Sequence, residues 1–89
     1  MDMTVIKQMV VAYLKEKIGE LDSAISNQNY EEIKGISHKI KGNSGSLALG
    51  LNVFNDIGKN MEKAAIDNEP MSVIQQYSEE LKSEYAKIL

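Results

Sequence analysis

The chain of 89 residues contains no cysteine and no tryptophan, and it has only one proline, one phenylalanine and one histidine. Without cysteine it has no disulfide framework and no cysteine-ligated metal site. Positive charge is also scarce, because 10 Lys and Arg residues oppose 13 Asp and Glu residues for a net charge of −3. Nucleic-acid-binding domains usually carry a basic stripe. The longest apolar run, Met9–Leu14, is far too short to span a bilayer. These absences disfavour nucleic-acid and membrane partners.

The length and composition indicate an ordinary globular domain. A chain of this size folds alone on a modest core, so residues 1–89 are expected to form a single domain. The apolar content of 43% and the charged content of 26% are typical of soluble proteins. The N-terminus lacks the charged start, long apolar stretch and cleavage site of a signal peptide, so we expect a cytoplasmic location.

Apolar residues recur at spacings of three and four in four successive segments, which is the pattern of amphipathic helices. No window shows the alternation typical of a strand, and the connections are short. The sequence therefore predicts an all-α fold, an up-down-up-down antiparallel four-helix bundle. The expected apolar stripes are Ile6, Val10, Leu14, Ile18, Leu21 and Ile25; Ile33, Ile36, Ile40 and Leu47; Leu51, Phe54, Ile57, Met61 and Ala65; and Ile74, Tyr77, Leu81, Tyr85 and Ile88.

Local signals mark the expected helix ends. The first helix should run from about Thr4 to Ser26. Asn29, followed three residues later by Glu32, has the spacing of a helix cap, so the second helix should begin at Tyr30. That helix is expected to continue to about Leu49, where Gly50 ends it. Pro70 suits the first position of the fourth helix.

The only histidine, His38, lies on the second predicted helix together with three glycines. Gly35, Gly42 and Gly45 precede or follow it by three, four and seven residues. At about 100° per residue these offsets share one helix face with the histidine. Glycine inside a helix costs about 0.5–1 kcal/mol relative to alanine. The pattern indicates that side chains have been removed from an exposed face so that a partner can approach.

Two lysines, Lys34 and Lys41, fall on the same side of the helix as His38. Imidazole can act as a nucleophile and form a covalent intermediate, and a lysine beside it can hold a phosphoryl group. In-line phosphoryl transfer also requires close approach of donor and acceptor. The alternative is that His38 is an exposed histidine without a role, that the lysines form a solvated face, and that the glycines mark helix packing.

The segment His38-x-x-Lys41-Gly42, followed by small residues, resembles the histidine phosphotransfer domains of bacterial multistep phosphorelays. The resemblance extends from about Val10 to Leu89, with Asn-Tyr-Glu-Glu at the start of the second helix and Met-Glu-Lys-Ala-Ala on the third. It implies that His38 accepts a phosphoryl group through Nε2, that Lys41 contacts the phosphoryl oxygens or the acidic site of the partner, and that Gly42 leaves room for that partner.

The resemblance also implies the partners. Such domains carry a phosphoryl group between the aspartates of receiver domains, on response regulators or on a hybrid histidine kinase. They act as monomers and have no cofactor of their own; they do not bind ATP, and the magnesium ion belongs to the receiver. One departure is Ala48, because the family typically has glycine ten residues after the histidine.

The expected receiver-docking surface extends beyond the phosphoacceptor. It includes apolar residues of the first helix that lie outside the core stripe and level with Gly45 and Ala48 in an antiparallel hairpin. The alternative is that the fourth helix covers them. The full predicted surface consists of Lys34, Gly35, Lys39, Gly42 and Gly45 with Met9, Val11 and Ala12.

Other chemistries fit the sequence less well. A carboxylate-bridged metal site needs Glu-x-x-His on two helices, but Gly35 occupies the position three before His38 and there is no second histidine. A hydrolase needs a serine or cysteine nucleophile and an acid that orients the histidine, and no acid is expected to do so. A Walker phosphate loop is absent. Two alternatives stay open: the phosphoacceptor domain of a chemotaxis-type histidine kinase, and a helical interaction module without phosphotransfer.

Overall fold

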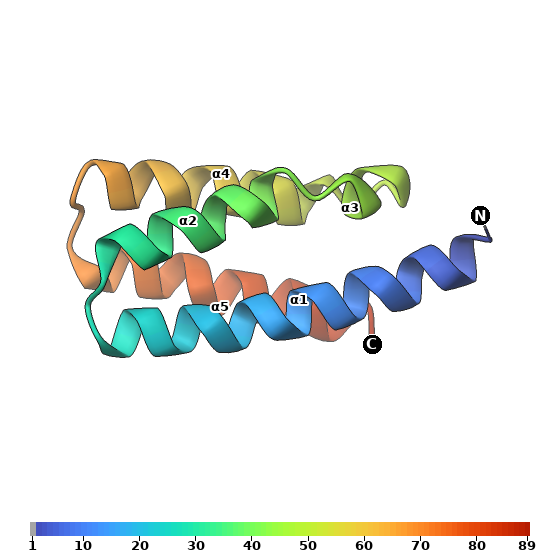
Figure 1. The fold of residues 1–89 in the computed structure, drawn as a ribbon, viewed down its shortest axis with the longest axis horizontal. Coiled ribbons are helices and arrows are strands. Elements are labelled where there is room, and N and C mark those ends of the chain that lie inside the picture. Colours follow the sequence, from blue (N-terminus) through green and yellow to red (C-terminus); the bar gives the residue numbers. More distant parts are fainter. Residues whose placement is uncertain (1) are drawn as a thin grey trace.

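The computed structural model describes residues 2–89, and every regular element in this range is a helix. The all-α prediction is therefore confirmed. Four longer helices pack together, and a short fifth helix joins the second and third of them (Figure 1). The helices are α1 (Met3–Ser26), α2 (Tyr30–Lys41), the short α3 (Ser44–Ala48), α4 (Asn52–Ile66) and α5 (Met71–Lys87).

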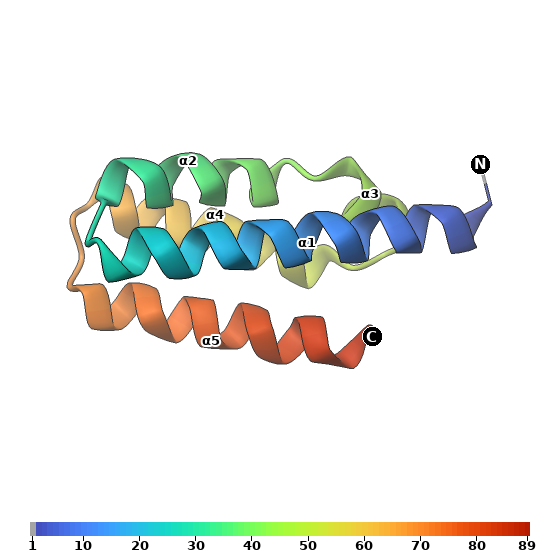
Figure 2. The ribbon, with the colours of Figure 1, turned by 60° about the horizontal axis from the view of Figure 1, so that its bottom comes forward.

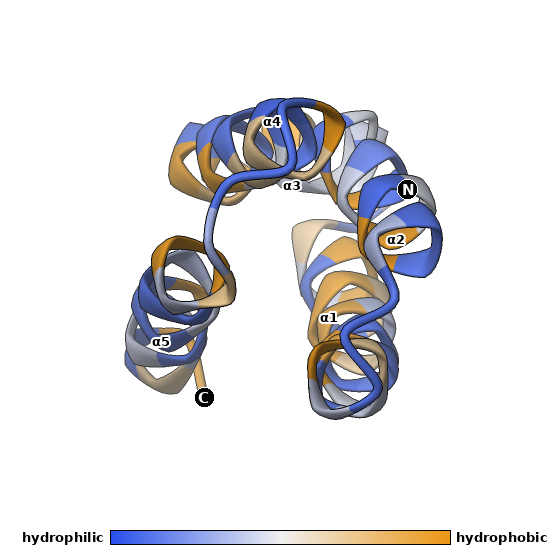
Figure 3. Cartoon of the chain, turned by 90° about the vertical axis from the view of Figure 1, so that its left-hand side faces the viewer, coloured by the Kyte–Doolittle hydropathy of each residue, from blue (hydrophilic) through white to orange (hydrophobic). Residues whose placement is uncertain are grey.

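The helices lie along the long axis of a molecule that measures 40 × 18 × 17 Å. The connections at 27–29 and 67–70 lie at one end of the molecule, whereas α3 and the N-terminus lie toward the other (Figures 1 and 2). The first turns of α1 extend past the rest of the bundle. The view along the long axis shows α4 beside α2, with α5 on the opposite side from α2 (Figure 3).

The predicted apolar stripes form the core, with one exception. Leu14, Leu21, Ile33 and Leu81 are fully buried, and twelve of the twenty predicted stripe residues are buried in all. Positions at the edges of the stripes, such as Ile6, Ile18, Tyr77 and Ile88, are half-buried against them. The prediction for Leu47 is wrong: its side chain is 53% exposed, because it lies on α3 and not on a continuation of α2.

The second predicted helix ends earlier than expected. It stops at Lys41, with Gly42 as its C-terminal cap, and the chain restarts as α3 after Asn43. The Asn43 side chain accepts hydrogen bonds from the backbone N–H and the hydroxyl of Ser46, at 2.7 and 2.9 Å. A capping asparagine stabilises a new helix start, so it competes with helix continuation.

The other helix-end signals are close to the structure. The Asn29 side chain accepts a hydrogen bond from the backbone N–H of Glu32 at 3.1 Å, so the predicted cap of α2 is confirmed. Gly50 has a φ of 73° just after α3, a conformation that glycine adopts without strain. Pro70 is the residue immediately before α5, one position earlier than predicted.

Helices α2 and α4 approach each other closely at Gly58. A methyl group at this position would lie 2.6 Å from the backbone nitrogen of Lys41 and 2.9 Å from the backbone oxygen of Ser37. Because no side chain separates the two backbones here, the α4 residues one turn further on reach the outer face of α2. Gly58 thus sets the spacing on which the candidate site depends.

Candidate functional site

His38 lies in the last turn of α2 with its side chain exposed to solvent. The imidazole is 67% exposed, and its Nδ1 lies 2.7 Å from Oε2 of Glu62 on α4. The hydrogen bond to the protein is therefore made at one edge of the ring, through the nitrogen nearer the backbone.

Glu62 joins the histidine to Lys41. Its second oxygen, Oε1, accepts a hydrogen bond from Nζ of Lys41, also at 2.7 Å. The Glu62 side chain is only 14% exposed, in contrast to the two groups that it binds. The hydrogen bond from Lys41, and then that from His38, lower the pKa of Glu62 below its usual value, although burial of the carboxyl acts in the opposite direction.

This arrangement defines the chemical state of the imidazole. An ionised carboxylate has no proton to give, so Nδ1 of His38 must donate the hydrogen bond to Glu62. In the neutral ring the other nitrogen, Nε2, then carries a lone pair. The site thus holds the tautomer in which Nε2 has a free lone pair.

Two buried contacts hold α4 in the register that this site requires. Gly58 precedes Glu62 by one turn and brings α4 against α2. Asn55, one turn earlier, donates its side-chain amide to the backbone oxygens of Lys41 and Asn43, both at 3.0 Å. The bond to Lys41 satisfies a carbonyl that the end of α2 leaves without a helical partner, and the bond to Asn43 ties down the residue that caps α3. Asn55 and Gly58 therefore fix the end of α2, the part of the helix that carries the site.

The three glycines predicted beside His38 do not behave alike. Gly35 and Gly42 are exposed, and an added methyl group would meet nothing at Gly35 and only the His38 backbone oxygen, at 3.5 Å, at Gly42. The expectation that Gly45 shares a helix face with His38 is wrong. This glycine lies on α3 beyond the end of α2, and a methyl group there would come within 2.8 Å of the Val10 side chain. Gly45 allows α3 to pack on α1 and is not part of the open face around His38.

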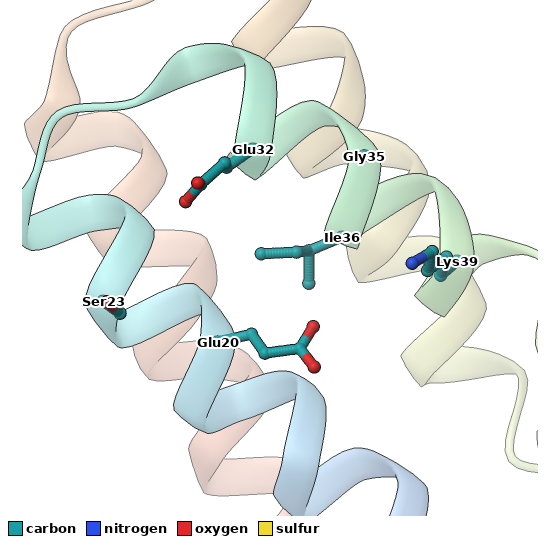
Figure 4. Close-up of a pocket in the computed structure, with 6 residues that line it drawn as sticks. All are labelled: Glu20, Ser23, Glu32, Gly35, Ile36 and Lys39. Carbon is teal, nitrogen blue, oxygen red and sulfur yellow. The ribbon is translucent and has the colours of Figure 1, made fainter.

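The predicted lysines lie on both sides of the histidine. Lys34 is half-buried and pairs with Glu31 at 3.2 Å. Lys39 is exposed and lines a shallow groove between α1 and α2 together with Gly35 (Figure 4). Ile36 also lines this groove, and Glu20 and Glu32 supply carboxylates from its two sides.

The predicted apolar residues of α1 are only partly brought together. Met9 is 57% exposed and lines a second groove together with Gly45 and Ala48. The sequence analysis expected these three residues at the same height along the helix axis. Val11 is half-buried and Ala12 is exposed, and neither lines this groove.

Glu62 is the site residue that the sequence interpretation missed, and the expectation that no acid orients the histidine is wrong. The two residues are separated by 24 positions, so no local pattern links them. A usable signal was nevertheless present. Gly58 is a glycine within an apolar helix stripe, where it marks close helix contact, and Glu62 follows it by one turn.

Within residues 2–89 no three side chains of His, Cys, Asp or Glu gather as metal ligands would. No helix of this range combines the length and the apolarity needed to span a membrane. Comparison of the chain with protein-family models, with curated proteins and with solved structures gives no match.

Proposed function

We propose that this protein is a histidine phosphotransfer domain. In this function, His38 accepts a phosphoryl group from an aspartyl phosphate of one receiver domain and passes it to the aspartate of another. The observation that carries the proposal is the 2.7 Å contact between Nδ1 of His38 and the carboxylate of Glu62, with the rest of the ring exposed. The up-down-up-down antiparallel topology belongs to the same proposal, and the placement of both short connections at one end of the molecule supports it.

The transfer follows from the state of the ring. The lone pair on Nε2 attacks the phosphorus of the aspartyl phosphate, and an N–P bond forms. The P–O bond to the aspartyl group breaks, and its electron pair leaves with the aspartate as a carboxylate. The Nδ1 proton stays in place, so the phosphorylated ring becomes cationic. Glu62 accepts the hydrogen bond from this ring and stabilises the positive charge that develops on it.

Lys41 would act after the donor arrives. Its ammonium group lies one turn beyond His38 and is held by Glu62 through a single oxygen. Because it is 37% exposed, it can turn toward phosphoryl oxygens without unfolding the helix. We expect it to hold the transferred group as a point charge. Gly35 and Gly42 leave the helix surface beside His38 open, which suits the close approach that phosphoryl transfer needs.

The test is transfer of labelled phosphate from a phosphorylated receiver domain to the protein. We expect one phosphoryl group per chain, with the acid-labile and base-stable character of phosphohistidine. His38→Gln should abolish labelling while the helical circular dichroism spectrum persists. Labelling that survives in this folded variant would refute the proposal. A parallel incubation with a histidine-kinase catalytic core and ATP tests the chemotaxis-type alternative, and absence of labelling by either donor would favour an interaction module.

A further inference from the structure

Asn55 lies on α4 in the contact with α2, and its side chain is buried although it is polar. The residue is only 7% exposed. Its side-chain nitrogen donates to the backbone oxygens of Lys41 and Asn43 at 3.0 Å, and it also reaches that of Ile40 at 3.4 Å. Because all three neighbours are acceptors, the amide must present its NH₂ group to them.

The oxygen of the same amide makes no such bond. Within residues 2–89, Oδ1 of Asn55 is buried and accepts no hydrogen bond. A buried acceptor without a partner costs free energy, and an apolar side chain would avoid that cost. The benefit of asparagine at this position therefore lies in its donors, which are directed at the end of α2 and at the residue that caps α3.

Lys41 is the residue on which the contacts of α4 converge. Asn55 binds its backbone oxygen, and Glu62 accepts a hydrogen bond from its Nζ at 2.7 Å. Between these two contacts, a methyl group on Gly58 would lie 2.6 Å from the Lys41 backbone nitrogen. The three α4 residues are three and four positions apart, so they form one stripe along the helix. This stripe holds the backbone of Lys41 as well as its side chain.

We propose that Asn55 is a positioning residue that acts through Lys41. It fixes the Lys41 carbonyl on α4 and so keeps the ammonium group within reach of both Glu62 and a phosphoryl group on His38. This inference rests on the proposed function, in which Lys41 holds the transferred group. Without Asn55, the last carbonyls of α2 would turn toward water or toward N–H groups further along the chain. Either movement shifts the point from which the Lys41 side chain extends.

The experiment is a double-mutant cycle on the initial rate of phosphorylation by phosphoramidate, a small donor that needs no docking surface. The cycle compares the wild type, Asn55→Ala, Lys41→Ala and the double variant. It reports whether the two residues act through one another, because a general loosening of the fold would slow the reaction equally with and without Lys41. Urea unfolding of the same samples gives the folded fraction by which each rate is divided. If Asn55→Ala does not fold, Asn55→Ser, which keeps one shorter donor, takes its place in the cycle.

The matched control is Ser37→Ala, measured in the same two backgrounds. Ser37 is also fully buried against α4, where its backbone oxygen would lie 2.9 Å from a methyl group on Gly58. Its hydroxyl, however, makes no hydrogen bond within the described part of the chain. The control thus removes a buried polar atom from the same helix contact without removing a bond to the end of α2.

We expect Asn55→Ala to slow phosphorylation about tenfold when Lys41 is present and less than about twofold in the Lys41→Ala background. Ser37→Ala should leave the rate within about twofold in both backgrounds. An unchanged rate in Asn55→Ala, equal slowing in both backgrounds, or equal slowing by Ser37→Ala would overturn the inference and leave the proposed function intact. So would a Lys41→Ala protein that reacts as fast as the wild type. If neither phosphoramidate nor a receiver labels the wild-type protein, the proposed function itself is wrong.

Discussion

Replacing Glu62 with glutamine tests the central contact of the site with the smallest change in shape. Glu62→Gln keeps the size of the side chain but removes its charge. An amide can also donate a hydrogen bond to Nδ1 of His38, and this would favour the tautomer in which Nε2 carries the proton. The variant should therefore lose both the stabilisation of the cationic ring and part of the population in which Nε2 is the nucleophile.

The size of the effect follows from the geometry. Two unit charges about 4 Å apart attract each other by about 4 kcal/mol at the effective dielectric constant of a protein surface, roughly 20. The His38 ring is 67% exposed, so we halve this value for additional screening by water, to about 2 kcal/mol. Since about 1.4 kcal/mol corresponds to a factor of ten in rate, we expect phosphorylation to slow about 30-fold.

The assay is the initial rate of phosphorylation by phosphoramidate, with the free energy of unfolding in urea measured on the same samples. The matched control is Glu84→Gln on α5, which removes a carboxylate that pairs with Lys87 in the same i,i+3 manner found elsewhere on the surface. We expect the control to retain the wild-type rate. A folded Glu62→Gln protein that is phosphorylated within about threefold of the wild-type rate would refute the role assigned to Glu62, because the electrostatic contribution would then be under 1 kcal/mol.

Three further predictions concern the same helices. Gly58→Ala should destabilise the protein by about 1–3 kcal/mol in urea unfolding, because the added methyl group overlaps the α2 backbone. Gly19→Ala, where the added methyl group meets nothing within 4 Å, should instead stabilise it by about 0.5–1 kcal/mol. Equal effects of the two changes would contradict the close contact at Gly58. The folded-state pKa of Glu62 is lowered from 4.5, so its ionised form stabilises the fold above that value. In acid titrations followed by circular dichroism, the stability difference between wild type and Glu62→Gln should therefore shrink as pH falls below about 4.5. A difference independent of pH would argue against the ionised pair. Gly42→Gln should stay folded but accept phosphate poorly from a receiver, because the new side chain obstructs the approach to His38; undiminished transfer would leave the open helix surface without a role.

The helices and their buried faces could be predicted from the sequence because the information is local. Ile33 and Ile40, for example, recur at the helical period, and both are fully buried. The break after Gly42 was missed, although Asn43 three positions before Ser46 is itself a capping signal. The sequence analysis assumed one continuous helix, which placed Leu47 in the core. Because the helix ends early, every residue after the break faces a different direction from the one expected.

Only the part of the candidate site that lies on α2 could be predicted from the sequence. His38 and Lys41 share a face by spacing alone, so their neighbourhood is visible in the sequence. Glu62 reaches them through the packing of α4 on α2, which depends on the absence of a side chain at Gly58. Interhelical register is a property of the assembled core, and no period within a single helix encodes it.

The early end of α2 has a consequence for the free energy of a phosphorylated state. A helix ends in carbonyl oxygens whose dipoles sum to about half a negative charge, and His38 lies in its last turn. Under the proposed function, a phosphoryl group on His38 would sit near this negative pole, at a cost of about 0.3–1 kcal/mol. Had α2 continued to Leu49, the pole would lie two turns further away. Ending the helix at Lys41 thus raises the transfer potential of the phosphorylated protein and favours delivery of the group over its storage.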